Sequence, residues 1–91
     1  GADGKPEGNF EKLVGQTQIA FAELLKRRVD AIYWFSDFED KVTPQVVEKL
    51  TAELMLKRVR LYLHNFAGPN IRPMLTEMAE KTGGTVDADK P

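Results

Sequence analysis

Five consecutive apolar residues, Ala31 to Phe35, end abruptly at the acidic loop Ser36 to Asp40. The run is short, rich in strand-forming residues, and apolar on both of its alternating faces. Strands that are covered on both sides, as in parallel sheets, have this pattern. The sequence therefore predicts a buried parallel strand over residues 31–36, with the acidic loop at its carboxyl end.

Helical and strand patterns alternate along the rest of the chain. Apolar residues spaced by three and four predict an amphipathic first helix, and a threonine followed by a proline begins a second one. Paired glycines end a third helix. The predicted order is helix 9–28, strand 31–36, a helix starting at Thr43-Pro44, strand 59–64, a helix ending at Gly83-Gly84, and strand 85–87.

This order predicts an α/β domain with three helices and a small three-stranded parallel sheet in sequential strand order. Right-handed crossovers place the two later helices on one face of that sheet. Helix 9–28 is then the only candidate to cover the opposite face, and strand 31–36 forms an edge. An uncovered aromatic-rich edge favours self-association, so we expect a monomer only if helix 9–28 or the N-terminal linker shields it.

Composition limits the function classes. Ninety-one residues make one small domain, expected over residues 9–87, with a flexible linker at 1–8 and a flexible tail at 88–91. Ends of this composition favour the interpretation that the chain is a piece of a longer protein. With 13 basic and 14 acidic residues the net charge is −1, which gives no reason to expect nucleic acid as a partner. No apolar run approaches the ~20 residues that span a bilayer. The lack of cysteine excludes thiolate chemistry but leaves the compartment open.

The carboxyl ends of parallel strands are where ligands bind in open sheets. Asp37, Glu39 and Asp40 place three carboxylates beside the Ser36 hydroxyl, and Mg²⁺ and Ca²⁺ prefer such oxygen ligands. A solvated loop that supports the next helix N-terminus electrostatically explains the same pattern. His64, at the end of the next strand, is either a ligand or base, or a structural or merely exposed histidine.

Two stretches resemble one known family. Asp30 to Asp37 is similar to the fourth strand of a von Willebrand factor type A domain. Met74 to Val86 is similar to the last helix and strand of that family, including the Thr82-Gly83-Gly84 ending. The resemblance covers roughly residues 9–87. It implies the second half of a doubly wound sheet.

The resemblance also implies roles for particular residues. Asp37 matches the strand-end aspartate that supports a metal ion-dependent adhesion site, with Ser36 beside it. Gly15-Gln16-Thr17 is weakly similar to the motif that supplies a metal-binding threonine, Thr17 here. The chain lacks the Asp-x-Ser-x-Ser motif and the first three strands of the family. The implied site is therefore incomplete and is expected to bind Mg²⁺ or Ca²⁺ only weakly.

The function implied by the resemblance is a non-catalytic protein-interaction module with a protein partner. Its expected binding loops contain Phe38, Glu39, Asp40, His64 and Asn65. An alternative follows from a fainter resemblance, of residues 35–43 to the nucleophile motif of haloacid dehalogenases. In that reading a small phosphoryl-transfer hydrolase uses Asp37 as nucleophile and Glu39 as acid/base, although Glu39 stands where that family has aspartate.

Overall fold

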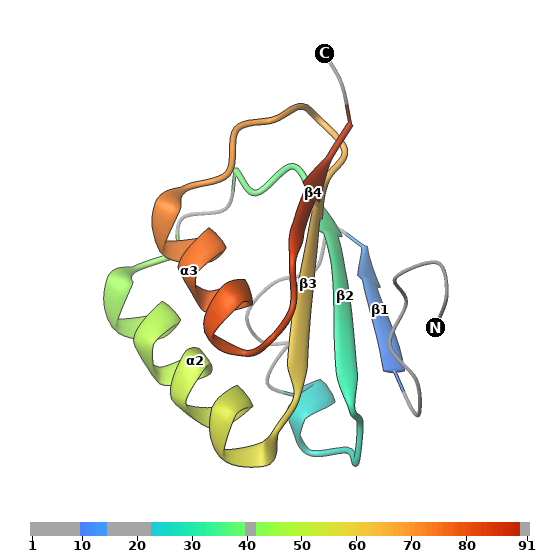
Figure 1. Ribbon diagram of the computed structural model, residues 1–91, viewed down its shortest axis with the longest axis vertical. Helices are drawn as coiled ribbons and strands as arrows, with labels where there is room; N and C mark the ends of the chain where they lie inside the picture. The colour runs from blue at the N-terminus through green and yellow to red at the C-terminus, as the bar shows by residue number, and fades with distance from the viewer. Residues whose placement is uncertain (1–9, 15–22, 40–41, 90–91) are drawn as a thin grey trace.

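The apolar run forms strand β2, Ala31–Ser36, inside a parallel sheet. The structure, a computed structural model, describes residues 10–14, 23–39 and 42–89. Four strands line up in sequential order in the sheet (Figure 1). They are β1, Phe10–Val14; β2; β3, Arg60–Asn65; and β4, Val86–Ala88. The predicted class, a small α/β fold with a parallel sheet in sequential order, is confirmed.

The prediction of a first helix over residues 9–28 is wrong at its beginning. Phe10–Val14 form strand β1, which pairs with β2 so that Phe10 aligns with Ala31 and Val14 with Phe35. Residues 23–25 are helical, as the prediction has it. Apolar residues at positions 10, 13 and 14 are compatible with either a helix or a strand, and pairing with β2 favours the strand. The sheet therefore has four strands instead of three, and β2 is an inner strand rather than an edge.

Helix α2, Pro44–Lys57, follows its sequence signals closely. The Thr43 side chain accepts a hydrogen bond from the Val46 amide at 3.2 Å, and Pro44 occupies the first turn. A residue in the left-handed region, Arg58 with φ 58°, ends the helix. Its buried stripe packs on the sheet and contains Val47, Leu50 and Leu54. Met55 of the same helix is 52% exposed.

Helix α3, Pro73–Lys81, packs beside α2 on the sheet, with Leu75, Met78 and Ala79 buried. Pro73 lies in its first turn, where the missing N–H leaves no helical acceptor unsatisfied. Thr82 then joins the helix to the sheet. Its hydroxyl donates to the Ala79 carbonyl at 2.8 Å and accepts from the Leu61 amide at 2.9 Å.

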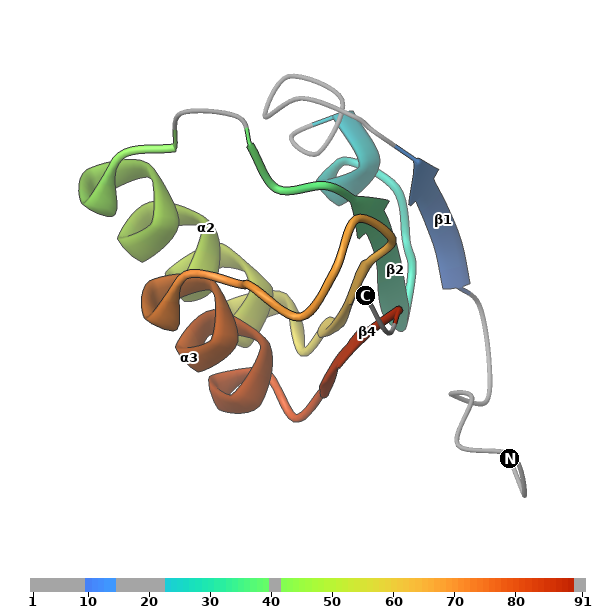
Figure 2. The same ribbon diagram turned by 90° about the horizontal axis from the view of Figure 1, so that it is seen from above.

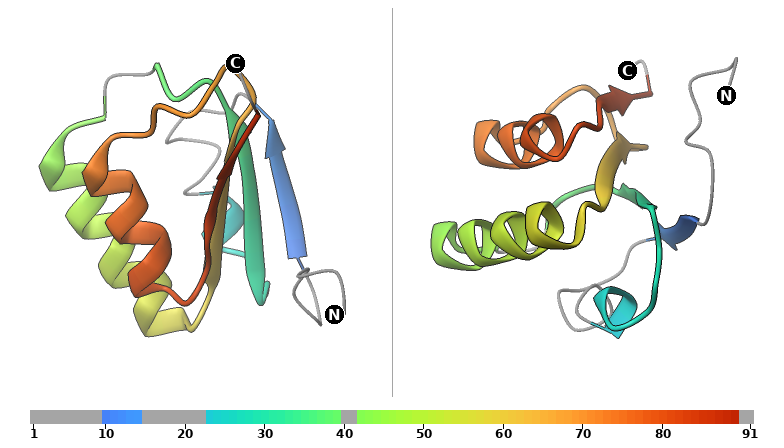
Figure 3. Two further views of the ribbon diagram at one scale, coloured as in Figure 1. Left: turned by 45° about the horizontal axis from the view of Figure 1, so that its top comes forward. Right: turned by 60° about the horizontal axis from the view of Figure 1, so that its bottom comes forward.

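All helical segments that the structure describes lie on one face of the sheet (Figures 2 and 3). Leu25 belongs to the same buried cluster as Leu54 of α2, and the Lys57 ammonium donates to the Leu25 carbonyl at 2.6 Å. The prediction that the first helix covers the opposite face is therefore wrong for its described part. Right-handed crossovers between sequential parallel strands always return to the same side. Within the described residues, no helix is long and apolar enough to span a bilayer.

Candidate functional site

Two loops meet at the carboxyl edge of the sheet because β2 and β3 run in the same direction. Residues 37–39 follow β2, and residues 66–72 follow β3. The Phe66 amide donates to the Ser36 carbonyl at 3.2 Å, which ties the start of the second loop to the end of β2. The edge that the sequence predicted as the binding edge therefore brings two chain segments together.

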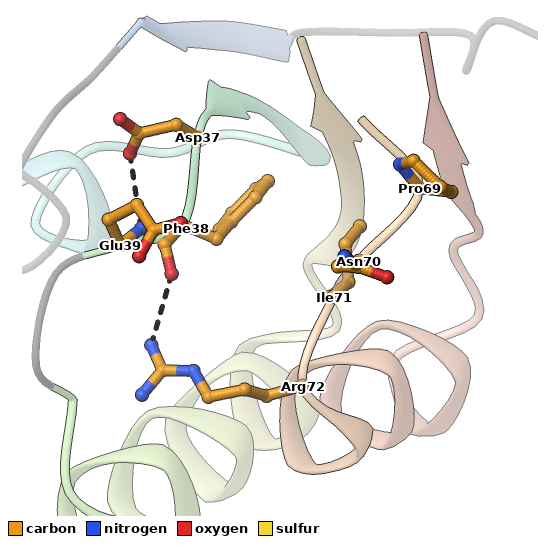
Figure 4. A pocket seen from close by; sticks show the side chains of 7 residues that line it. All are labelled: Asp37, Phe38, Glu39, Pro69, Asn70, Ile71 and Arg72. Carbon is orange, nitrogen blue, oxygen red and sulfur yellow. Dashed lines mark hydrogen bonds between the residues drawn. The ribbon is translucent and has the colours of Figure 1, made fainter. Parts of the chain in front are cut away.

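Two consecutive side-chain turns shape the acidic loop. The Ser36 hydroxyl accepts a hydrogen bond from the Phe38 amide at 3.0 Å, and Ser36 is 3% exposed. The Asp37 carboxylate accepts from the Glu39 amide at 3.1 Å (Figure 4). Turns of this kind satisfy backbone donors locally. They leave Asp37 and Glu39 exposed at the edge while Ser36 is committed to the backbone.

Phe38 anchors the loop to the core. Its φ of 53° lies in the left-handed region, which costs a non-glycine residue roughly 1–2 kcal/mol. Its ring is buried and meets the Trp34 ring edge-on, with centroids 5.0 Å apart. Burial of a phenylalanine side chain is worth about 1.5–3 kcal/mol, enough to offset the backbone strain.

The second loop is fixed by the side chain at the end of β3. Asn65 is 3% exposed, and its amide group donates to the Asn70 carbonyl at 2.7 Å. Its carbonyl oxygen accepts from the Ala67 backbone at 2.9 Å. Asn65, expected as a binding residue, is thus buried and holds the backbone of the second loop through these two hydrogen bonds.

A pocket of about 440 Å³ opens between the two loops (Figure 4). The Arg72 guanidinium reaches across it to the Phe38 carbonyl at 3.5 Å. Two carboxylates, one guanidinium, one amide and three apolar side chains thus line one small pocket. Its lining residues are Asp37, Phe38, Glu39, Pro69, Asn70, Ile71 and Arg72.

The pocket gathers part of the predicted site. Asp37, Phe38 and Glu39 line it, and Ser36 and Asn65 lie directly beneath the loops. Thr17 and Asp40, also predicted for the site, lie outside the described residues. Within residues 10–14, 23–39 and 42–89, no three histidine or acidic side chains are grouped as a metal cage. Asp37 and Glu39 are therefore the two carboxylates that the described part of the site offers as ligands.

His64 lies at the carboxyl end of β3, as predicted, but its ring does not face the pocket. It is on the face of the sheet opposite α2 and α3, with its ring 5.3 Å from the Phe35 ring. Its Nε2 atom lies 2.8 Å from Asp89 Oδ1, and Nδ1 lies 3.5 Å from Asp87 Oδ2. The histidine therefore links β3 to β4 and to Asp89, which follows β4.

Sequence reasoning missed the contribution of the second loop. Gly68-Pro69-Asn70 marks a turn, but its partner across the pocket is set by the pairing of Ser36 with Asn65 in the sheet. Arg72 precedes a helix-starting proline and shows no local sign of reaching Phe38, 34 residues away. Strand register alone brings these residues together.

Comparison with known proteins adds no family to this description. No family model, no characterised protein and no solved structure matches the chain.

Proposed function

We propose that this chain is a non-catalytic protein-interaction module that resembles part of a von Willebrand factor type A domain. The observation that carries the proposal is the acidic loop at the carboxyl edge. Its backbone is held by the Ser36 hydroxyl and the buried Phe38 ring, while Asp37 is exposed at the pocket. Backbone that already has these contacts is preorganised for binding, because less chain entropy is lost when a partner docks.

The charges of the pocket favour a partner segment with a basic side chain. Two of the three charged groups in the lining are carboxylates, Asp37 and Glu39, and the third is Arg72. A lysine or arginine of the partner would meet the carboxylates, and a neighbouring backbone carbonyl would accept from Arg72. Pro69 and Ile71 provide the apolar contact that such small interfaces need.

Metal binding by this module is proposed to be weak. Ser36 is buried and its hydroxyl already accepts the Phe38 amide, so Asp37 is the main oxygen ligand that the described loop offers. One or two carboxylates and water make a poor cage for Mg²⁺ or Ca²⁺. We expect dissociation constants in the millimolar range.

Titration of the ¹⁵N-labelled chain with MgCl₂ and CaCl₂, followed by backbone amide NMR shifts, tests this proposal. We expect the amides of residues 36–39 to move at millimolar metal, with NaCl at matched ionic strength as the background. Asp37→Asn should abolish the shifts. Glu80→Gln, which removes an exposed carboxylate from the far end of α3, should leave them unchanged. Unmoved amides at residues 36–39 would contradict a cation-binding role for the loop.

An aryl phosphate assay separates this proposal from the phosphoryl-transfer alternative. An interaction module hydrolyses no p-nitrophenyl phosphate above the uncatalysed rate, with or without Mg²⁺. Hydrolysis by the wild-type chain that Asp37→Asn abolishes would instead support Asp37 as a nucleophile.

A further inference from the structure

Another pocket, of about 320 Å³, lies at the amino ends of β2 and β3. Val29 and Val59 in its lining stand just before these strands. Figure 1 shows the helical residues 23–25 and the C-terminal end of α2 at this same end of the sheet, which is opposite the carboxyl edge. We call it the basic pocket. The described residues that line it are Leu25, Lys26, Arg27, Arg28, Val29, Lys57 and Val59.

The charges in this lining all have one sign. Four of the seven residues are lysine or arginine, and none is acidic. These four residues are exposed, whereas Leu25, Val29 and Val59 are buried. A cleft that is lined by charge of one sign, with apolar walls of low dielectric constant, concentrates ions of the opposite sign. The basic pocket is therefore suited to an anion.

Helix capping accounts for only part of this positive charge. Cations often stand near helix C-termini because they complement the helix dipole. The Lys57 ammonium has such a role, since it donates to the Leu25 carbonyl at 2.6 Å. The end of α2 is closed by its own backbone, because the Arg58 amide donates to the Met55 carbonyl at 3.2 Å. Arg28 is exposed and takes no part in either of these caps.

We propose that the basic pocket binds the phosphate group of an organic ligand through Lys26, Arg28 and Lys57. The Lys57 ammonium uses one of its three protons on the Leu25 carbonyl, which leaves two for an anion. The planar guanidinium of Arg28 provides a fork of donors that matches phosphate oxygens. Arg27 already has an interaction partner, so the contacts are assigned to the other three cations.

The local charge favours a phosphate over a single carboxylate. Lys26 is paired with Glu23 at 3.0 Å, and both side chains are largely exposed, so the pair is weak and open to exchange. Three cations and this one carboxylate leave two positive charges, which match a phosphate dianion. Residues 15–22, which precede this segment in the sequence, contain no acidic residue.

The size and the apolar part of the lining favour a ligand that carries more than the phosphate itself. Pockets for small molecules begin at about 300 Å³, and this one is about 320 Å³. Leu25, Val29 and Val59 offer apolar contact beside the cations. A soluble organic phosphate and a phospholipid headgroup share this chemistry, and the two sources are separated by experiment.

Titration of the ¹⁵N-labelled full chain with sodium pyrophosphate, at constant ionic strength and without divalent metal, tests the proposal. We expect the amides of residues 25–29 and 57–59 to shift with a dissociation constant of about 1 mM, because the contacts are exposed and screened by salt. Amides that stay unmoved at about 20 mM pyrophosphate would overturn the proposal.

Charge-neutralising variants show whether the pocket or the general surface binds. Arg28→Gln and Lys26→Gln should each weaken pyrophosphate binding at least threefold, because each removes a charge-assisted contact. Lys49→Gln makes the same change on an exposed part of α2 outside the pocket and should leave binding unchanged. Equal weakening by all three substitutions would overturn the assignment to the pocket.

Co-sedimentation with vesicles of phosphatidylcholine and phosphatidic acid separates the two sources of phosphate. Pyrophosphate shifts without vesicle binding support a soluble ligand. Pyrophosphate shifts together with vesicle binding, both weakened by Arg28→Gln, support a lipid headgroup in the same pocket. Vesicle binding without pyrophosphate shifts would overturn the proposal, because a charged membrane attracts exposed cations without entering a pocket. These readouts are independent of the metal titration, which reports on the carboxyl edge.

Discussion

Among the described glycines, Gly84 is the one whose surroundings leave the least room for a side chain. It is buried between α3 and β4, and its amide donates to the Ala79 carbonyl at 2.9 Å. A Cβ atom at this position would lie 1.8 Å from the Leu61 carbonyl oxygen, far inside any real contact. Only glycine lets the end of α3 approach β3 this closely.

Gly84→Ala should therefore destabilise the fold by about 3 kcal/mol or more, since relief of the clash requires the backbone to move. Gly83→Ala is the matched control, because its Cβ would meet only the Arg60 side chain at 3.6 Å. Its φ of 89° makes alanine cost about 1 kcal/mol. Urea unfolding of both variants measures the difference. Equal losses would contradict the close approach at Leu61.

At the candidate site, single residues were predictable where their signal was local. Ser36 and Asp37 stand directly after an apolar run, so their place at a carboxyl edge follows from the sequence. The Ser36 hydroxyl is buried and Asp37 is exposed in a loop whose next residue, Phe38, has a left-handed backbone. No pattern in the sequence predicts that backbone conformation. Arg72 was missed because its contact crosses 34 residues.

Among the elements, α2 shows how strong local signals translate into structure. Thr43, Pro44 and the left-handed Arg58 fix its two ends, and each has a recognised physical role. Strand β1 shows the opposite case. Its five residues have apolar spacings that suit either a helix or a strand, and only pairing with β2 distinguishes them. Tertiary pairing therefore overrode the helical pattern.

The N-terminal cap of α2 provides a test at the level of a single element. Thr43→Ala removes the acceptor of the Val46 amide and should cost about 1 kcal/mol of unfolding free energy. Thr51→Ala removes a hydroxyl that donates to the Val47 carbonyl inside the same helix. That change should stay within about 0.5 kcal/mol, because alanine has the higher helix propensity. Thermal unfolding by circular dichroism compares the two, and a larger loss for Thr51→Ala would contradict the cap assignment.

At the scale of the whole molecule, the parallel sheet in sequential order was predictable from alternating helices and strands. The side of the sheet on which α2 and α3 lie was predictable, but the side of the first helix was predicted wrongly. Right-handed crossovers determine that α2 and α3 share a side, and the same rule puts residues 23–25 with them once β1 is a strand. The expectation that the first helix covers the opposite face failed because β1 was not recognised.

The carboxyl edge of the sheet follows from the same architecture. We propose that this edge is where the chain binds its partner. Paramagnetic broadening by Mn²⁺ tests it most directly, because the effect falls steeply with distance from the bound ion. At low Mn²⁺ concentration, the amides of residues 36–39 and 69–72 should broaden first, and Asp37→Asn should remove that preference. Broadening centred on Asp87 and Asp89, or spread evenly over the exposed carboxylates, would contradict the claim.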